Sequence, residues 1–518
     1  MDPTGLLLDA ITESLPEERN SLRQLKKRIA ETTRTPLLRN DRLLRRYRED
    51  VAQGTRLADE RVERILRLNA IRSESGIATV TVITKPYACP GRCVYCPTEA
   101  RAPKSYLTNE PAVMRALRSD YDPFDQVRHR LAALYETGHP TDKIELIVKG
   151  GTWSFYPQDY QQWFVQRCFD AANGFGESAP SSSESLAAAH ETNEHARSRL
   201  VGLTIETRPD YINPVEIDRL LKLGVTRVEL GVQSLEEEVL ALTVRDHGLE
   251  AVRDATRLLK DAGFKIAYHL MPNLPLATPQ SDIESARRIF SEPDFQPDTI
   301  KLYPCVVVES AELYDWWRDG RYKPYDDATL VDLLASIKEL VPPYVRIERV
   351  IRDIPSTSIA GGCLLTNLRE SVFVRMKERG VRCRCIRCRQ VRGPVDDGFA
   401  AVRRTYAASG GTEEFLSFED PEQTRLASLL RLRIPAAGKT ALVRELHSYG
   451  EHLPLQTKRA SAVQHRGYGR QLLEQAEVIA RDEHGMDKIA VISGVGAREY
   501  YRKFGYALEG PYMVKTLL

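Results

Sequence analysis

Residues 85 to 97 read Lys85-Pro-Tyr-Ala-Cys-Pro-Gly-Arg-Cys-Val-Tyr-Cys-Pro97, and the spacing of the three cysteines in this stretch decides the fold. The stretch, called here the cysteine loop, follows a β-branched run from Ala78 to Thr84 that predicts a strand. Three thiolates on one loop can hold three corners of a four-iron four-sulfur (4Fe-4S) cluster and leave the fourth iron open, whereas a closed cluster or a structural zinc needs four protein ligands. We therefore predict that Cys89, Cys93 and Cys96 bind an iron–sulfur cluster. A zinc knuckle that lacks one ligand, or a disulfide with a spare thiol, stays open as an alternative.

This spacing, with Tyr95 just before the third cysteine, resembles the motif of radical-SAM enzymes. In that family S-adenosylmethionine (SAM) chelates the open iron. The resemblance implies SAM as a cofactor and an electron donor to the cluster as a partner.

Length and composition favour a multidomain protein of a reducing compartment. The chain has 518 residues, of which 42% are hydrophobic, so two or three cores are expected. No apolar run approaches the ~20 residues that span a membrane, and the N-terminus lacks the basic start and apolar core of a signal peptide. Nine cysteines, six of them in two close groups, suit metal ligands better than secreted disulfides. We expect a cytoplasmic protein without membrane contact.

A strand-then-helix rhythm fills residues 76 to about 345. Because parallel strands need crossover connections, this rhythm predicts an α/β fold with a partial (β/α)6 barrel and outer helices. The predicted strands are Ala78–Thr84, Ile144–Lys149, Val201–Glu206, Arg227–Gly231, Phe264–His269 and Thr299–Tyr303. One insertion, Gly174 to Ser198, is rich in Ser, Ala and Glu and is expected to be a mobile surface loop.

Polar residues stand at the C-terminal ends of these strands, where barrels of this kind place their active sites. They are Lys149, Gly150, Gly151, Glu206, Arg208, Gln233 and His269. The glycine pair would let the backbone approach the amino-acid part of SAM, and Glu206 and Arg208 are candidates for its ribose and carboxylate. Gln233 and His269 are expected on the same rim, and Lys149 is a candidate for contact with substrate or the radical site. A polar residue at a strand end can also simply cap a helix, and this alternative stays open.

A second group of cysteines follows in the run Arg382-Cys-Arg-Cys-Ile-Arg-Cys-Arg389. Cys383, Cys385 and Cys388 suggest a zinc site that needs one more ligand, with Cys363 as the candidate and a histidine or water as alternatives. Reduced structural thiols are the other interpretation. The interleaved Arg384, Arg387 and Arg389 would repel one another unless an RNA backbone relieves the repulsion.

From about Phe399 the pattern changes to antiparallel strands, expected at Phe399–Ala407, Glu414–Phe418, Leu426–Ile434 and Leu442–Tyr449. Gln464-His-Arg-Gly-Tyr-Gly469 then leads into an amphipathic helix to Arg481 and a strand from Lys488. This arrangement resembles the pyrophosphate loop of GNAT acetyltransferases, in which backbone N–H groups meet the phosphates of coenzyme A at a helix N-terminus. The resemblance implies acetyl-CoA as co-substrate, contacted by Glu445, Leu446, His447, Gln464, His465, Arg466, Gly467, Tyr468, Gly469, Arg470, Ser493 and Tyr501. Tyr500 or Tyr501 would lie near the thioester sulfur and donate a proton to the leaving thiolate, and one of this adjacent pair must point elsewhere.

The N-terminal segment is strongly basic although the net charge of the whole chain is only +2. Eleven Lys and Arg residues against Glu31 and Asp41 lie between Arg19 and Arg48. Such a run predicts phosphate contact, and we expect RNA to be bound by Lys26, Lys27, Arg28, Arg45 and Arg46. A solvated helix face is the alternative.

Several linking sequences resemble the catalytic subunit of the Elongator complex over residues 76 to 518. They are Ile205-Glu-Thr-Arg-Pro-Asp-Tyr211, Gly231-Val-Gln-Ser234, Ile300-Lys-Leu-Tyr-Pro304, Arg352-Asp-Ile-Pro355, Asn367-Leu-Arg-Glu370, Leu442-Val-Arg-Glu-Leu-His447 and Ile489-Ala-Val-Ile-Ser-Gly-Val495. The resemblance implies an enzyme that forms 5-carboxymethyluridine at the wobble position of tRNA, with the anticodon stem-loop as partner. The retained second cysteine group points to the stand-alone prokaryotic type, a monomer or a homodimer. The expected domains are a basic helical tRNA-binding arm (1–75), a radical-SAM domain (76–345), a zinc-binding linker (346–395) and a GNAT domain (396–518).

The implied chemistry suits a carbon–carbon bond at an unactivated position. A radical derived from SAM would take hydrogen from the acetyl methyl of acetyl-CoA, the carbon radical would add to carbon 5 of uridine, and thioester hydrolysis would leave the carboxymethyl group. The protein would supply orientation and exclude water.

Two other functions stay open as alternatives. A protein lysine acetyltransferase of the histone type would keep the radical-SAM domain only as a structural part, but the intact cysteine loop and the basic arm argue against it. A non-enzymatic tRNA-binding scaffold would sense SAM and acetyl-CoA without turnover. Conversion of SAM to 5′-deoxyadenosine would separate the scaffold from an enzyme.

Overall fold

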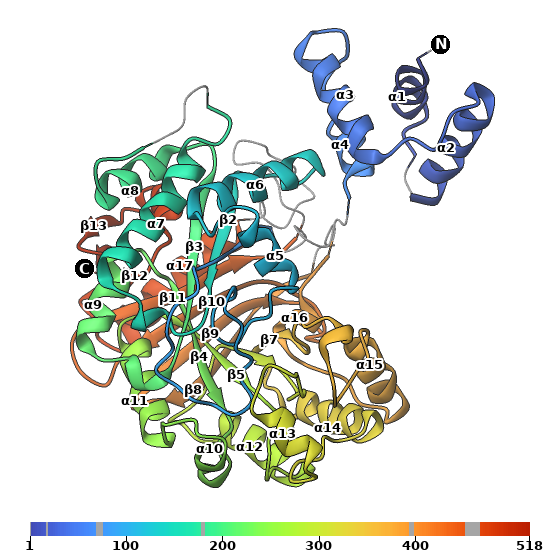
Figure 1. Cartoon of the computed structure of the whole chain (residues 1–518). Coiled ribbons are helices and arrows are strands. Elements are labelled where there is room, and N and C mark those ends of the chain that lie inside the picture. The colour runs from blue at the N-terminus through green and yellow to red at the C-terminus, as the bar shows by residue number, and fades with distance from the viewer. Residues whose placement is uncertain are drawn as a thin grey trace.

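The computed structural model describes residues 2–16, 19–68, 76–177, 182–392, 398–450 and 467–517. Two seven-stranded sheets form the body, and a small helical arm projects from it (Figure 1). None of the helices in these ranges is long and apolar enough to cross a membrane.

The arm consists of four helices: α1 (Pro3–Ser14), α2 (Arg19–Thr33), α3 (Asn40–Ala52) and α4 (Glu60–Leu66). They enclose their own apolar core, which includes Leu8, Leu43 and Tyr47. Two hydrogen bonds connect the arm to the body. Arg48 Nη1 donates to the carbonyl of Tyr135 at 2.6 Å, and the backbone N–H of Leu68 donates to the carbonyl of Thr137 at 3.0 Å. The expected helical, basic N-terminal arm is therefore present.

The first sheet is wholly parallel, with its strands in chain order. They are β1 (Ala78–Ile83), β2 (Lys143–Lys149), β3 (Arg199–Thr207), β4 (Arg227–Gln233), β5 (Lys265–Leu270), β6 (Thr299–Leu302) and β7 (Arg346–Arg349). Among the described strands β1 and β7 do not pair, so the sheet curls into a partial barrel that stays open on one side. All six predicted strands are confirmed. The seventh was missed because three of its four residues are charged and only Ile347 is fully buried.

Helices cover the outside of this sheet (Figure 1). The helices of this part of the chain are α5 (Pro111–Leu117), α6 (Pro123–Glu136), α7 (Gln158–Asn173), α8 (Leu186–His195), α9 (Pro214–Lys222), α10 (Glu237–Leu242), α11 (Leu249–Asp261), α12 (Pro279–Ser291), α13 (Leu313–Arg318), α14 (Asp327–Leu340), α15 (Leu368–Glu378) and α16 (Ile386–Arg389). Among them α13 packs against the cysteine loop, where the N–H of Leu313 donates to the carbonyl of Val94 at 2.8 Å. Strand β7 extends the sheet beyond residue 345, where the boundary of the radical-SAM domain was expected. The four-domain division stays a prediction.

The prediction of a mobile loop from Gly174 to Ser198 is wrong for the second half of this range, which forms α8. Ser185 caps this helix by accepting from the backbone N–H of Ala188 at 3.2 Å, and the alanine-rich run that follows has high helix propensity. Glu194 at its end is mostly buried and forms ion pairs with Arg498 at 2.9 Å and Arg502 at 2.5 Å. The insertion therefore holds the C-terminal domain.

The second sheet is mixed, in the order β13-β14-β12-β11-β10-β9-β8. Its strands are β8 (Ala400–Ala408), β9 (Gly411–Glu419), β10 (Leu426–Ile434), β11 (Thr440–Ser448), β12 (Lys488–Val491), β13 (Ala507–Glu509) and β14 (Tyr512–Thr516), and its helices are α17 (Tyr468–Val478) and α18 (Arg498–Arg502). The expected antiparallel strands are confirmed, whereas β13 and β14 were not predicted. β11 pairs in parallel with β12 only as far as Val443 and Val491, and then runs on without it to Ser448. Residues 444–448 of β11 are therefore not paired with β12, and they border the space between the two strands that is called here the cleft.

Buried ion pairs join the two sheets. Arg444 of β11 donates to both carboxylate oxygens of Asp298, at 2.7 and 2.6 Å, and to Glu413 at 2.6 Å. All three side chains are at most 1% exposed. Burial penalises the charge of Asp298, but Arg444 and then Lys260 outweigh it and hold its pKa far below the usual range. A Cβ on Gly494 would lie 2.2 Å from the carbonyl oxygen of Val201, so the domains also meet backbone to backbone.

Candidate active site

One large cavity, of about 790 Å³, lies inside the partial barrel and reaches the second sheet. Its walls contain alternate residues of the parallel strands, as expected for the inner face of a sheet, together with the cysteine loop. Glu445, His447 and Tyr449 of β11 and the turn after it line the same space. A single cavity therefore connects the cysteines with the C-terminal domain.

The cysteine loop lies at one end of this cavity. Cys93 is 6% exposed, and Cys89 and Cys96 are partly exposed. Arg245 Nη1 donates to Cys93 Sγ at 3.5 Å. The hydrogen bond with Cys96 is the main cause that lowers the pKa of Cys93 to about 5, and Arg245 supports it against the effect of burial. The loop thus favours a thiolate, which is the form that binds metal.

The glycine pair after β2 adopts backbone angles that other residues avoid. Gly150 has φ of 139° and Gly151 has φ of 91°. A Cβ on Gly150 would lie 1.8 Å from Thr84 Oγ1, so glycine is required there for space as well as for conformation. Gly151 lines the cavity beside Thr152, whose Oγ1 lies 3.8 Å from Cys89 Sγ.

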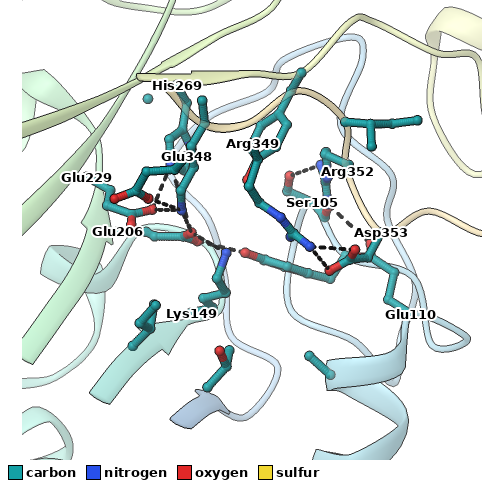
Figure 2. A pocket seen from close by; sticks show the side chains of 18 of the residues that line it. Ser105, Glu110, Lys149, Glu206, Glu229, His269, Glu348, Arg349, Arg352 and Asp353 are labelled. Carbon is teal, nitrogen blue, oxygen red and sulfur yellow. Dashed lines mark hydrogen bonds and ion pairs between the residues drawn. The ribbon is translucent and has the colours of Figure 1, made fainter. Parts of the chain in front are cut away.

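The middle of the cavity holds charged side chains that face one another (Figure 2). Lys149 Nζ lies 2.9 Å from Glu206 Oε1, and His269 Nε2 lies 2.8 Å from Glu229 Oε2. Lys301 forms ion pairs with Glu229 and, at 3.8 Å, with Glu206. The structure thus brings together Lys149, Glu206 and His269, which the sequence had singled out separately.

The charges in this group stabilise one another. Burial opposes ionisation of Glu206, but Lys149, Lys301 and His269 together outweigh it and lower the pKa of that carboxyl. Burial also opposes the charge of Lys149, but Glu206, Tyr106 and Tyr303 together raise its pKa above the ordinary value. Burial lowers the pKa of His269, and the hydrogen bond with Glu229 only partly opposes this. At neutral pH the group holds two carboxylates, two ammonium ions and a neutral imidazole.

Two other predicted residues, Arg208 and Gln233, also line the cavity. Arg208 is 4% exposed and donates to both oxygens of Asp210 at 2.9 Å, while its Nη1 is buried without a hydrogen-bond partner. Gln233 Oε1 is likewise buried without a partner among the described residues. Polar atoms left in this state indicate a polar ligand, since burial without a hydrogen bond is costly.

Sequence reasoning missed several residues of this cavity. Glu229, Arg245 and Tyr106 were not singled out, although Tyr106 donates to Glu206 Oε2 at 2.7 Å. Lys301 and Arg352 stood in two of the quoted linking sequences without a role. The available signal was a charged residue inside a strand whose neighbours are all buried, as for Glu229 in β4 and Lys301 in β6. Such a residue must face a partner or a ligand.

The donor set fits an iron–sulfur cluster with a bound amino acid. Three thiol side chains come from one loop, and beside them lie two buried nitrogen atoms, Arg208 Nη1 and Arg245 Nε, that have no hydrogen-bond partner in the described part of the chain. These nitrogens can face an anion such as a cluster thiolate or a carboxylate.

The second cysteine triplet, Cys383, Cys385 and Cys388, is closely gathered. Its three Sγ atoms lie within 4.8 Å of one another, and no ligand atom of Cys363 belongs to that group. Cys363 instead faces Asp327, and burial is the main cause that raises its pKa to about 11. The hydrogen bonds from Cys383 and Cys388 hold the pKa of Cys385 well below its usual range. The triplet can hold a metal ion without Cys363.

The arginines between these cysteines separate. Arg389 is buried and forms an ion pair with Glu419 at 2.6 Å. It therefore stabilises the fold, and the expectation that it contacts RNA is not met. Arg384 is exposed, and Arg387 lines the cavity. Burial, then Arg369, lowers the pKa of Arg387 to about 10. An external anion would relieve the repulsion between Arg387 and Arg369.

The first turn of α17 lies beside the unpaired end of β11. Gly467 caps that helix with φ of 74°, and a Cβ on Gly469 would lie 2.9 Å from Tyr500 Oη and 3.7 Å from Ser448 Oγ. Tyr500 thus faces the cleft, and burial raises its pKa to about 12. Tyr501 packs in the core of this domain instead. Gln464, His465 and Arg466 lie outside the described residues.

The remaining predicted residues of this domain have other contacts. Glu445 forms ion pairs with Lys265 of β5 and, at 2.8 Å, with Arg431. Tyr468 stacks on Phe418 with ring centroids 4.2 Å apart. Arg470 forms an ion pair with Glu474, Ser493 donates to the carbonyl of Gly494, and Leu446 lies beside the cleft.

The five basic residues predicted in the arm differ in what they contact. Lys26 donates to Asn40 Oδ1 at 2.7 Å, and burial lowers its pKa. Arg45 lies 3.8 Å from Glu136, and Arg46 forms ion pairs with Asp50 and Asp2. Lys27 and Arg28 are exposed. The last two fit phosphate contact best.

Comparison with known proteins agrees with the architecture. The family model of the Radical SAM superfamily matches residues 83–287, that of the Radical_SAM C-terminal domain matches 297–378, and that of the Acetyltransferase (GNAT) family matches 460–506.

Curated relatives match over most of their length. The tRNA uridine(34) acetyltransferase of Dehalococcoides mccartyi is 48% identical over 461 residues, which cover 86% of this chain and 99% of the relative. That of Methanocaldococcus jannaschii is 43% identical over 543 aligned positions, covering 100% and 99%. Human Elongator complex protein 3 is 44% identical, covering 87% and 86%. The solved structure of Methanocaldococcus infernus Elp3 with an N-terminal deletion superposes with a TM-score of 0.75 at 44% identity, covering 86% of this chain and 100% of that one.

Proposed function

Because this chain belongs to the family of the tRNA uridine(34) acetyltransferases and Elongator complex protein 3, we propose that it forms 5-carboxymethyluridine at the wobble position of tRNA from acetyl-CoA and a SAM-derived radical. The observation that carries this proposal is the continuous cavity. Its walls contain Cys89, Cys93 and Cys96 at one end and Glu445 and His447 at the other. Two chemistries that must act on one acetyl group need such a shared space.

The cysteine loop would hold the 4Fe-4S cluster, which when bound supplies the electron that cleaves SAM into methionine and an oxidising radical. Gly150 and Gly151 would let the backbone approach the amino-acid part of SAM. Glu206 would accept from its ribose, and Arg208 Nη1 would pair with its carboxylate. Gln233 and His269 would complete this side of the cavity. Lys149 would stay charged beside Glu206 and orient the substrate.

Acetyl-CoA would enter through the cleft between β11 and β12. The N-terminal turn of α17 at Gly467 and Gly469 would bind the pyrophosphate through backbone N–H groups. The pantetheine would then lie along Leu446 and Ser448, which line the cleft beside Tyr500. We assign proton donation to the leaving thiolate to Tyr500 rather than Tyr501, since Tyr501 belongs to the apolar core.

The anticodon stem-loop would be bound by the arm, by the exposed Arg384 and by Arg387, which lines the cavity. Lys27 and Arg28 of α2 and these two arginines would meet backbone phosphates. The second cysteine triplet would bind zinc, with water or an additional residue as fourth ligand, and would hold the short helix α16 that carries Arg387. An external electron donor would serve the cluster.

The protein lysine acetyltransferase remains the weaker candidate. Acetyl transfer to lysine needs a base that takes a proton from the incoming ammonium. Glu445, the carboxylate in the part of β11 that runs past β12, is held in ion pairs with Lys265 and Arg431, which outweigh burial and keep its pKa far below its usual range. A carboxylate in this state is a poor proton acceptor at neutral pH.

The test is an anaerobic reaction of the reconstituted protein with tRNA transcript, SAM, reductant and methyl-deuterated acetyl-CoA. Mass spectrometry of the tRNA nucleosides should detect 5-carboxymethyluridine, and 5′-deoxyadenosine should carry deuterium because hydrogen is taken from the acetyl methyl. Omission of either SAM or acetyl-CoA should abolish the product. Unlabelled 5′-deoxyadenosine together with labelled tRNA would contradict the proposed order of steps.

A further inference from the structure

Arg245 is a buried cation without an acidic partner. Its side chain is 6% exposed, and among the described residues it forms no ion pair with a carboxylate. Nη2 donates to the carbonyl of Gly231 at 2.5 Å, Nη1 donates to Cys93 Sγ at 3.5 Å, and Nε is buried without a hydrogen-bond partner. The free-energy cost of burying a guanidinium is large unless an anion lies beside it.

The neighbouring arginine makes the contrast clear. Arg208 also lies against the cysteine loop, since a Cβ on Gly91 would be 2.3 Å from its Nη1. Its charge, however, is balanced by Asp210, which accepts from two of its nitrogens. Among the described residues, Arg245 has no carboxylate beside it and faces Cys93 Sγ, the hydroxyl of Tyr95 and the carbonyl of Gly231.

We infer that Arg245 is the built-in counter-charge of the cluster, and that it acts through Cys93 to make one-electron reduction of the cluster easier. This inference rests on the iron–sulfur assignment of the proposed function. Reduction adds one negative charge beside Cys93, with the electron supplied from outside the protein. A positive charge 3.5 Å from Cys93 Sγ stabilises the reduced form more than the oxidised form, and the burial of both side chains weakens the screening of this charge by water.

The fold holds Arg245 in this place. It follows Val244 and precedes Asp246, which both have positive φ, 53° and 61°, and so it sits in a tight turn after α10. The backbone of this turn is tied to the cysteine loop, because the carbonyl of Thr243 accepts from the N–H of Val94 at 3.2 Å. The guanidinium is therefore positioned by backbone contacts that do not involve the cluster.

The test is a potentiometric titration of the reconstituted holoenzyme, followed by electron paramagnetic resonance and performed without SAM, acetyl-CoA or tRNA. Dithionite supplies the electrons through mediator dyes. Arg245→Gln should lower the ratio of reduced to oxidised cluster at a fixed ambient potential by tenfold or more, which corresponds to about 59 mV for one electron. Arg245→Lys, which keeps the charge, should retain most of the wild-type potential.

Arg92→Gln is the matched control. Arg92 directly precedes Cys93 but is exposed, so water screens its charge and the midpoint should stay at the wild-type value. An unchanged midpoint in Arg245→Gln, or an equal shift in Arg92→Gln, would overturn the inference. Iron and sulfide content are measured in each variant. Loss of the cluster in Arg245→Gln but not in Arg245→Lys would support a need for the charge, whereas loss in both would contradict it.

Titration with SAM separates a second role. If Arg245→Gln keeps the wild-type midpoint but binds SAM more weakly, the guanidinium serves SAM and the inference is wrong. A wild-type protein that assembles no cluster would contradict the proposed function itself, which is a different result from a cluster whose potential ignores Arg245.

Discussion

The two cysteine triplets have similar residues but different surroundings. Cys89, Cys93 and Cys96 lie on a loop at the end of an open cavity, two of them partly exposed. Cys383, Cys385 and Cys388 lie against α14 and β7, with their sulfur atoms already gathered within 4.8 Å. The first arrangement leaves room for a ligand to reach the bound group, and the second supports a helix. Spacing alone, C-x3-C-x2-C against C-x-C-x2-C, would not separate a reacting site from a structural one.

Each triplet nevertheless has a buried cation. Arg245 lies 3.5 Å from Cys93 Sγ, and Lys338 Nζ lies 4.0 Å from Cys388 Sγ. Lys338 is fully buried in α14 and, among the described residues, has no carboxylate within ion-pair distance. A cation beside three thiolates compensates their charge whatever metal they hold. The two triplets therefore differ in access and not in charge compensation, and variants that remove one part at a time test this difference.

The largest effect is expected for Cys93→Ala. Two thiolates cannot hold the cluster, so both SAM cleavage and tRNA modification should fall below detection. The fold should persist because the loop lies beside the cavity, and the melting temperature of the protein prepared without iron should change little. Retained formation of 5′-deoxyadenosine would contradict the role of this triplet.

Cys385→Ala should instead act on stability. The side chain is fully buried, and metal bound by this triplet contributes directly to folding, so the free energy of unfolding should fall by more than about 2 kcal/mol. Chemical denaturation followed by circular dichroism measures this. The iron–sulfur absorbance of the folded fraction should remain. An unchanged unfolding midpoint together with loss of the iron–sulfur absorbance would reverse the two roles.

Lys338→Met tests the second cation. Without the ammonium the three thiolates lose their compensation, and zinc affinity should fall by roughly 10–100-fold, the range seen when partners of metal ligands are removed. Competition with a chromophoric chelator measures it. Lys222→Met, at an exposed lysine that pairs with Asp218, is the control and should leave zinc affinity unchanged. Equal affinity in both variants would show that Lys338 is only packed beside the sulfurs.

The smallest effect is expected for Arg387→Gln. This residue lines the cavity, so tRNA affinity should fall several-fold and the dependence of affinity on salt should become shallower by about one counterion. Arg389→Gln, two residues away, should leave the salt dependence unchanged and lower stability, because Arg389 is buried against Glu419. Filter binding at a series of salt concentrations distinguishes them. Identical salt slopes in the wild type and Arg387→Gln would remove Arg387 from the RNA contact.

Periodic features were predictable from the sequence. The six strands from β1 to β6 followed from apolar runs with helices between them, and the polar strand ends did meet around one cavity. The family that the quoted motifs suggested agrees with the relatives and with the matched family models. These features depend on residues that are close in the chain.

Features that depend on distant partners were missed. The charged residues of strand β7 have partners far away in the chain: Glu348 pairs with Arg227 and Lys301 inside the cavity. Helix α8 was taken for a loop because the partners of its buried Glu194, Arg498 and Arg502, lie some 300 residues further on. Which tyrosine faces the cleft, Tyr500 or Tyr501, depended on a rotation of α18 that adjacent identical residues cannot reveal.

The buried ion pairs between the sheets also affect how the stability of the protein depends on temperature. The cost of taking charges out of water falls as temperature rises, whereas the stabilisation from apolar burial levels off. The contact of Arg444 with Asp298 and Glu413 should therefore strengthen relative to the apolar cores on heating. The arm, whose small core contains no comparable buried ion pair among its described residues, is where melting should begin. On heating, RNA binding by the arm should therefore be lost before the contact between the two domains that line the cavity.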